Sequence, residues 1–225
     1  MRPRDRAWYL DLYFAAGVGI VALAIWLFST LVEDVLEKDP LVRWDAAVSA
    51  WVHARTTPTG VRVLTALTHL GSATVTWIIA AAGVPVLRRR RILLTGWAAA
   101  FLGASILEQI LKGAVQRGRP PDEIAHVESQ SYSFPSGHTL KAVVCYAMLA
   151  FVAGRLADIR GVRRILLYVA AAILILGIGL SRVYLGAHYP SDVFGALTVG
   201  IAWLAIVFVG IRLAEHRWGR TPPKA

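Results

Sequence analysis

VFGALTVGIAWLAIVFVGIRL, residues 193–213, contains a single charged residue, Arg212. A helix of about 20 such residues crosses the hydrocarbon core of a bilayer. Five other stretches are comparably apolar, and the last two of them are near the short limit for a span: Trp8–Val32, Leu64–Leu87, Ile92–Leu111, Thr139–Ala157 and Ile165–Leu180. None shows the alternation of a barrel strand, so helices are the expected spanning form. We therefore predict an all-α integral membrane protein, with six transmembrane helices in one bundle that forms a single membrane-embedded domain over residues 1–225.

The composition agrees with a membrane protein and excludes other classes. Hydrophobic residues make up 56% and charged residues 17% of the 225 residues, against about 45–50% and 25% in soluble domains. The mean hydropathy is +0.56. These values exclude a disordered chain, a coiled coil and a typical soluble enzyme. The single cysteine, Cys145, excludes an internal disulfide framework and a cysteine-based zinc site.

The distribution of the cations predicts the topology. The formal net charge is +10, and 15 of the 24 cations share one side if the first span starts in the cytoplasm. Cytoplasmic loops carry such an excess of Lys and Arg. The cations on that side are Arg2, Arg4, Arg6, Arg88 to Arg91, Arg155, Arg160, Arg163, Arg164, Arg212, Arg217, Arg220 and Lys224. We therefore expect both termini in the cytoplasm of a multi-pass plasma-membrane protein, and no nucleic-acid partner. The first apolar run is too long for a signal peptide and is interpreted as a retained signal anchor.

An amphipathic helix is predicted at residues 39–55, between the first two spans. Its apolar stripe at helical spacing consists of Leu41, Trp44, Val48 and Trp51, and the polar residues off the stripe are Arg43, Asp45 and Ser49. This pattern is typical of a helix that lies in the membrane interface with its indoles at headgroup depth. We interpret it as an anchor between spans, and a lid or a guide for lipid entry is the alternative.

Three segments carry residues typical of a catalytic site. They are KGAVQRGRP at residues 112–120, PSGH at residues 135–138 and SRVYLGAHYPSD at residues 181–192. Each stands where a span ends or begins, and the charge-derived topology puts all three on the outer side of the membrane. Residues far apart in the sequence can therefore meet in one pocket, which faces the periplasm or the cell exterior.

The cations of these segments indicate a site for a phosphate dianion. Lys112, Arg119 and Arg182 offer three positive charges and many N–H donors. Ser136 is a good N-cap, and Gly137 lets backbone N–H groups approach an anion closely at a helix N-terminus. Arg117 is interpreted differently, as a cation that extends to the membrane interface.

The histidines of the same segments favour phosphoryl-transfer chemistry. His188 and Asp192 are four residues apart, and Pro190 is typical of a helix start. Asp192 is then expected to hold one ring nitrogen of His188 and leave the other free to attack phosphorus. His138 is a candidate proton donor to the leaving oxygen. Metal ligation by these residues is the competing idea, but three nearby cations would repel a metal ion, so we predict no metal and no other cofactor.

The three segments together resemble the signature of the type 2 phosphatidic acid phosphatase superfamily of membrane lipid phosphatases. The matching positions are Lys112 to Arg119-Pro120, Pro135 to His138, and Ser181-Arg182 through His188 to Asp192. The resemblance implies that His188 is the nucleophile, oriented by Asp192, and that His138 is the general acid. It also implies no metal cofactor and a phosphate site made of Lys112, Arg119, Ser136, Gly137, His138 and Arg182. Vanadium haloperoxidases share this anion pocket, but the ones to compare are soluble.

We therefore expect a metal-independent lipid phosphatase that hydrolyses a phosphomonoester or pyrophosphate through a phosphohistidine. Its substrate would be of the undecaprenyl pyrophosphate, phosphatidylglycerol phosphate or phosphatidic acid type. A lipid phosphotransferase that uses the same site is the alternative, and a non-enzymatic transporter is disfavoured because no internal repeat is visible. The loop at residues 121–134, with Asp122, Glu123 and Glu128, is expected to border the entrance. The sequence assigns no oligomeric state.

Overall fold

The computed structural model describes residues 3–37, 40–121, 123, 125, 126 and 131–218, with side chains from Leu12 onward. In these residues it contains eight helices and no strand. The helices are α1 (Pro3–Glu37), α2 (Pro40–His53), α3 (Pro58–His69), α4 (Ala73–Leu87), α5 (Arg91–Val115), α6 (Gly137–Leu156), α7 (Gly161–Tyr184) and α8 (Pro190–Trp218). Six helical segments of the described residues are long and apolar enough to cross a membrane. The predicted all-α bundle of six spans with one additional helix after the first is confirmed.

The second span differs in detail from the prediction. The stretch at residues 64–87 belongs to two helices, α3 and α4, which begin at separate N-caps, Thr57 and Ser72. Gly71 lies at the break between them. An ideal Cβ atom on Gly71 would lie 3.0 Å from the carbonyl oxygen of His138, which is tighter than almost all real contacts. The break therefore lets the second span approach the first turn of α6.

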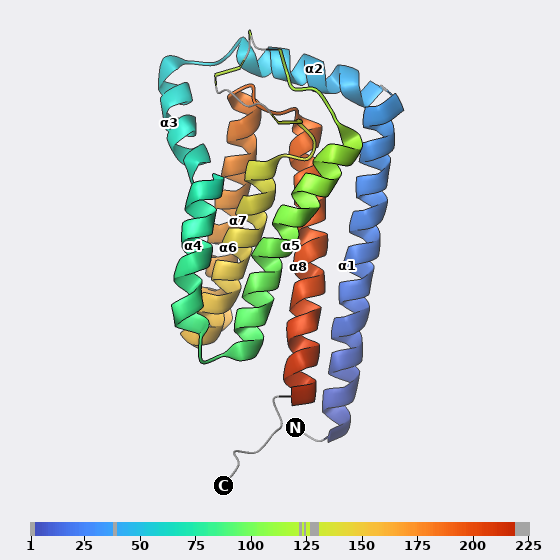
Figure 1. The fold of residues 1–225 in the computed structure, drawn as a ribbon, viewed down its shortest axis with the longest axis vertical. Helices are drawn as coiled ribbons and strands as arrows, with labels where there is room; N and C mark the ends of the chain where they lie inside the picture. The colour runs from blue at the N-terminus through green and yellow to red at the C-terminus, as the bar shows by residue number, and fades with distance from the viewer. Residues whose placement is uncertain (1–2, 38–39, 122, 124, 127–130, 219–225) are drawn as a thin grey trace.

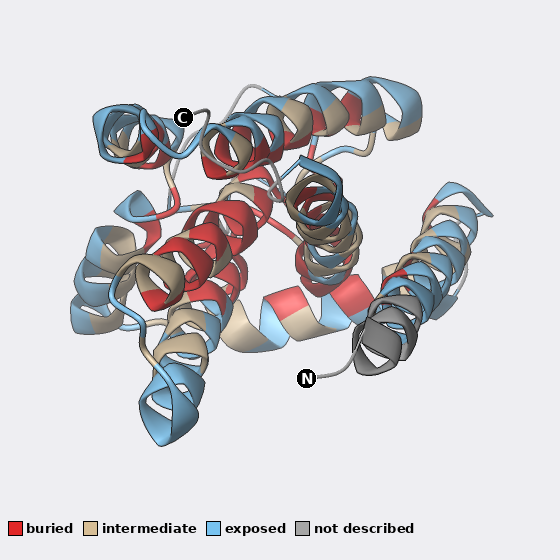
Figure 2. Ribbon diagram, turned by 90° about the horizontal axis from the view of Figure 1, so that it is seen from below, coloured by how far each residue is buried: buried red, intermediate tan, exposed pale blue. Residues whose placement is uncertain are grey.

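α6 lies in the centre of the bundle and has more buried residues than any other described helix. Figure 2 shows the buried residues gathered where the helices face one another and the exposed ones on the outer faces. α8 approaches α6 closely at Gly200, where an added Cβ atom would lie 2.7 Å from the Val143 side chain. The indole N–H of Trp97 donates to the carbonyl of Ala80 over 2.9 Å, so this buried polar group has a partner in the apolar core.

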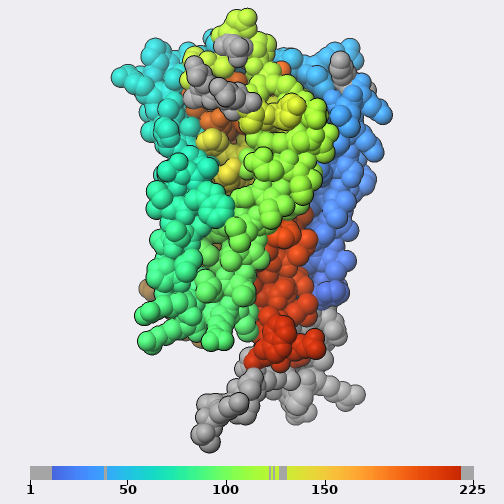
Figure 3. Space-filling model, in the orientation of Figure 1, coloured from blue at the N-terminus to red at the C-terminus, as the bar shows by residue number. Residues whose placement is uncertain are grey.

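α2 lies across one end of the bundle, here called the α2 end (Figure 1). The described residues of the segment that joins α5 to α6 lie at the same end (Figure 3). Trp44 and Trp51 of α2 are exposed, Trp51 by 59%, whereas Asp45 and Ser49 are buried. The aromatic stripe therefore faces away from the protein, as expected for an interfacial helix, and the polar face of α2 packs against the bundle.

Candidate functional site

The three predicted segments meet at the α2 end. Lys112 lies in the last turn of α5, the PSGH segment opens α6, and Arg182 lies in the last turn of α7. His188 precedes α8, and Asp192 lies in its first turn. The structure thus brings together residues that are up to about 80 positions apart in the sequence.

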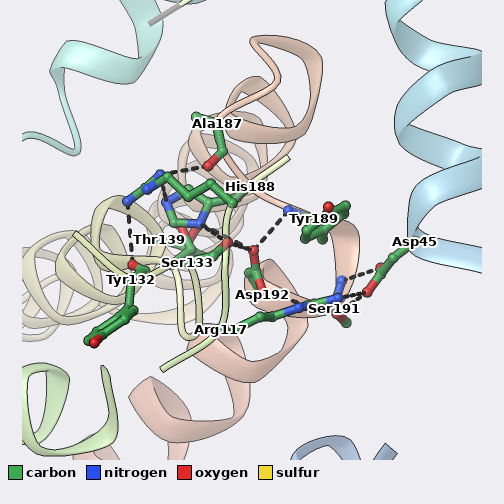
Figure 4. Close-up of polar contacts among 12 residues, drawn as sticks. Asp45, Arg117, Tyr132, Ser133, Thr139, Ala187, His188, Tyr189, Ser191 and Asp192 are labelled. Atoms are coloured by element: carbon green, nitrogen blue, oxygen red, sulfur yellow. Dashed lines mark hydrogen bonds and ion pairs between the residues drawn. The ribbon is translucent and has the colours of Figure 1, made fainter. Parts of the chain in front are cut away.

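The start of α8 fixes Asp192 next to His188. Tyr189 precedes the helix, Pro190 is its first residue and Asp192 its third, so the Asp192 carboxylate can reach back to the cap. Its Oδ2 atom accepts the backbone N–H of Tyr189 over 2.8 Å. The same Oδ2 atom lies 3.3 Å from Nδ1 of His188 and also accepts the hydroxyl of Ser133. A capping arrangement at a helix N-terminus therefore also orients the imidazole (Figure 4).

The surroundings of His188 keep its imidazole neutral. The residue is 2% exposed and Asp192 is 0% exposed. Burial lowers the pKa of His188 to about 4, although Asp192 acts in the opposite direction. Because the Asp192 carboxylate can only accept a hydrogen bond, we place the ring proton on Nδ1, and the lone pair of Nε2 is then available.

Arg119 faces the free nitrogen of His188. Its Nη1 atom lies 3.4 Å from Nε2 of His188 and donates to the carbonyl of Ala187 over 2.6 Å. Its Nε atom donates to the carbonyl of Ser131 over 2.7 Å. Burial lowers the pKa of Arg119, but the ordinary value is so high that the guanidinium remains charged. A positive group is therefore held at the place where a group attached to Nε2 would lie.

The other two predicted cations, Arg182 and Lys112, have N–H donors available to a ligand. Arg182 donates from Nη1 to Thr68 over 3.2 Å, and its buried Nε has no hydrogen-bond partner among the described residues. Lys112 donates from Nζ to the hydroxyl of Ser131 over 3.1 Å. His138, which is partly buried, lies close enough to Arg182 and His188 to interact with both electrostatically. An unsatisfied buried donor is costly unless a ligand or water accepts from it, so this donor set fits an anion.

The N-terminus of α6 adds backbone N–H groups to the same set of donors. Ser136 is the N-cap, but its side chain makes no capping hydrogen bond to the helix. It instead accepts the hydroxyl of Thr139 over 3.0 Å. The first N–H groups of a helix lack partners within the helix, so they remain available to a phosphate oxygen.

Arg117 was wrongly interpreted as a cation at the membrane interface. Its side chain is only 8% exposed and forms ion pairs of 2.7 Å with both Asp192 and Asp45. Burial would lower its pKa, but Asp192 and Asp45 outweigh that effect and raise the pKa above the ordinary value. The sequence signal for this role was the position of Arg117, which follows the third predicted span and lies two residues before Arg119.

Two buried acids were not included in the predicted site. Asp45 of α2 accepts a hydrogen bond from Arg117. The sequence signal for its burial was the polar pair Asp45 and Ser49, which are four residues apart and lie opposite the tryptophans of α2. Glu108 of α5 accepts a hydrogen bond from Lys141 and lies 3.5 Å from Nζ of Lys112.

Glu108 also gives a packing reason for the glycine of the PSGH segment. An ideal Cβ atom on Gly137 would overlap the Glu108 carboxylate. The glycine therefore leaves room for the Glu108 carboxylate, in addition to the close approach of an anion that we expected.

Part of the predicted entrance loop lies outside the described residues. This applies to Asp122 and Glu128, while Glu123 is described and exposed.

The chain is similar to several known phosphatases. Residues 93–214 match the family model described as the PAP2 superfamily. The chain is 27% identical over 192 residues to phosphatidylglycerophosphatase B of Bacillus subtilis (strain 168), covering 82% of this chain and 92% of that protein. It is 31% identical over 146 residues to decaprenylphosphoryl-5-phosphoribose phosphatase of Mycobacterium tuberculosis (strain ATCC 25618 / H37Rv), covering 63% and 75%. Its fold matches the crystal structure of a transmembrane PAP2 type phosphatidylglycerolphosphate phosphatase from Bacillus subtilis with a TM-score of 0.75 and 24% identity, over 90% of this chain and 98% of that chain.

Proposed function

The chain belongs to the PAP2 superfamily, and from this premise we propose that it removes a terminal phosphoryl group from a membrane lipid at His188. The observation that carries the proposal is the position of Arg119, 3.4 Å from the free nitrogen of a buried histidine whose other nitrogen faces Asp192. A neutral imidazole nitrogen is a nucleophile, and a fixed cation beside it stabilises the charge of a transferring phosphoryl group.

The proposed reaction has two steps. In the first, Nε2 of His188 attacks phosphorus and the bond to the leaving oxygen breaks, while His138 donates a proton to that oxygen. In the second, His138 accepts a proton from water, the water oxygen attacks phosphorus, and inorganic phosphate leaves His188 in its original state. Positioning and charge stabilisation by Lys112, Arg119 and Arg182 supply most of the rate enhancement. No metal ion takes part.

The proposed substrate class is a phosphomonoester or diphosphate on a lipid anchor. The six apolar spans support it, since they keep the site in the membrane. The names of the two relatives support it as well, since both describe the removal of phosphate from a lipid. We propose that the α2 end faces the periplasm or the exterior and that both termini are cytoplasmic, as the positive-inside rule predicts.

The test is phosphate release from a lipid panel by the purified protein in detergent with EDTA present. The panel contains phosphatidylglycerol phosphate, phosphatidic acid, undecaprenyl pyrophosphate and decaprenylphosphoryl-5-phosphoribose. We expect release from at least one of these lipids, inhibition by orthovanadate, and labelled phosphate trapped on the protein by a quench in alkaline detergent, in which the N–P bond of a phosphohistidine survives.

His188→Gln should abolish both phosphate release and trapping, because it removes the nucleophile. The matched control is His216→Gln, in the last turn of α8, where the side chain is exposed; it should behave as the wild type. Activity that is lost in EDTA and restored by magnesium would contradict the metal-free mechanism. Transfer of phosphate to an added lipid alcohol in preference to water would identify a phosphotransferase.

A further inference from the structure

The two oxygen atoms of Asp192 have different partners. Oδ2 accepts from His188, Ser133 and Tyr189. Oδ1 accepts from Nη1 of Arg117 over 2.7 Å. Because the carboxylate is held from both sides, it cannot rotate away from the imidazole. Arg117 thus fixes the direction in which Asp192 faces His188.

Arg117 is itself held by a residue of the interfacial helix. Its Nη2 atom donates to Oδ2 of Asp45 over 2.7 Å. Figure 4 shows the guanidinium between Asp192 and Asp45, beside Ser191. The Nη1 atom of Arg117 also donates to the Ser191 hydroxyl over 2.6 Å. The guanidinium carbon of Arg117, Cζ, lies 4.4 Å above the ring centre of Tyr189.

Asp45 also binds the first turn of α8. The backbone N–H of Ser191 donates to Oδ1 of Asp45 over 3.0 Å, and the Ser191 hydroxyl donates to Oδ2. This N–H has no partner within α8, and a carboxylate at a helix N-terminus is favourable. A residue of α2 therefore caps the helix that carries Asp192.

The charge of Asp45 determines how strongly Asp192 can act on His188. Asp45, Arg117 and Asp192 together carry one net negative charge. Without Asp45 the positive charge of Arg117 would be compensated only by Asp192, and the carboxylate would stabilise a positive imidazole less. Among the described residues, the other charged or titratable groups that act on His188 are Arg119, Arg182 and His138, and none of them is a carboxylate that could substitute.

We propose that Arg117 and Asp45 are positioning residues of the reaction. Arg117 orients the Asp192 carboxylate, and Asp45 neutralises Arg117, so that the charge of Asp192 acts on His188. α2 is therefore part of the catalytic machinery as well as a membrane anchor. This inference rests on the proposed function, in which the imidazole of His188 gains positive charge when it attacks phosphorus.

The test is a double-variant cycle with Asp45→Asn, Arg117→Gln and the variant that contains both. Asp45→Asn makes the cluster neutral, and the double variant restores one net negative charge. We expect Asp45→Asn to lower kcat about tenfold with KM unchanged. A tenfold loss corresponds to a fall of about one unit in the pKa of His188, that is, to a tenfold weaker stabilisation of its positive form. The double variant should be faster than either single variant, because the cluster again has one net negative charge and the hydrogen bonds from Ser133 and Tyr189 still hold Oδ2 of Asp192 near His188. Arg43→Gln on α2 and Glu37→Gln at the end of α1, both exposed, are the controls that should leave kcat unchanged.

If Arg117 and Asp45 have a purely structural role, the opposite order of kcat is expected for Asp45→Asn and the double variant. If the residues only stabilise the fold, removing both costs at least as much as removing one, and a double variant as slow as Asp45→Asn overturns the proposal. Arg117→Gln leaves two buried carboxylates without a cation, which is strongly destabilising. If it does not fold, the comparison between Asp45→Asn and the double variant still decides.

A second measurement separates this inference from the proposed function. Nitrogen-15 NMR of labelled histidine in detergent, assigned with His188→Gln, follows the pKa of His188 without any substrate. We expect a lower pKa in Asp45→Asn than in the double variant, and the same pKa in both would overturn the inference. If the NMR order holds but no lipid is hydrolysed, the proposed function fails and the positioning of His188 by α2 stands.

Discussion

The two site histidines differ in what holds them. His188 is enclosed, with Nδ1 facing Asp192 and Nε2 facing Arg119. His138 stands in the first turn of α6 and is partly exposed. A nucleophile requires a fixed direction of attack, whereas a proton donor needs access to the leaving oxygen. The structural difference therefore parallels the difference in proposed roles.

These roles give different sensitivities to the leaving group. His138→Ala should lower the rate about 10²–10⁴-fold on a lipid alkoxide leaving group, the usual value of general-acid help. The loss should be smaller on p-nitrophenyl phosphate, whose leaving oxygen needs little protonation. Steady-state rates on both substrates measure the difference.

The control for this comparison is His188→Ala, which should be inactive on both substrates because no phosphoenzyme forms. Equal losses for His138→Ala on the two leaving groups would mean that His138 is not the acid.

At the level of helices, the contact between α6 and α8 sets the distance between His138 and the His188–Asp192 pair. Gly200 makes this contact possible, because its missing side chain leaves room for Val143. Cores tolerate added methyl groups poorly where the backbone approaches so closely.

We expect Gly200→Val to destabilise the protein by about 1–3 kcal/mol through overpacking. The midpoint of thermal unfolding in detergent should fall, and activity should fall with it. Gly210→Val is the matched control on the same helix, since nothing lies within 4 Å of an added Cβ atom there. If both variants unfold at the same temperature, the α6–α8 contact is looser than described.

Sequence predicts some of these elements better than others. The spans were predictable because each is a long apolar run, whose length the bilayer dictates. The break at Gly71 was not, because it depends on the backbone of His138 in another helix. The same reason applies to Arg117 and Asp45: their ion pair joins residues 72 positions apart, and no local periodicity connects them. Most of the predicted site residues stand in or next to the end of a helix, which local sequence does mark, whereas Arg119 lies in the segment between α5 and α6.

At the level of the whole molecule, the proposed orientation can be tested by labelling. In a Cys145→Ser background, a cysteine replaces Thr59, exposed in α3 next to α2, or Ala157, exposed between α6 and α7. An impermeant thiol reagent should label Thr59→Cys in intact cells and Ala157→Cys only after lysis, because the α2 end is expected outside. Gly161 is a poorer inner probe, since its φ of 55° strains any side chain. The reverse labelling pattern would place the site in the cytoplasm.

The hydrogen bonds between Asp45 of α2 and Ser191 at the start of α8 also have a consequence for the order of biosynthesis. Asp45 and Ser191 are 146 residues apart, so at about 5–20 residues per second the carboxylate waits on the order of ten seconds for this partner, although Arg117 is synthesised earlier, 72 residues after Asp45. Inside a span, an unpaired aspartate would cost about 2.5–3.5 kcal/mol during insertion. On an interfacial helix it stays hydrated until the last helix arrives. The nascent chain can therefore be inserted helix by helix, and the cluster around Asp192 is completed only when the final span is in place.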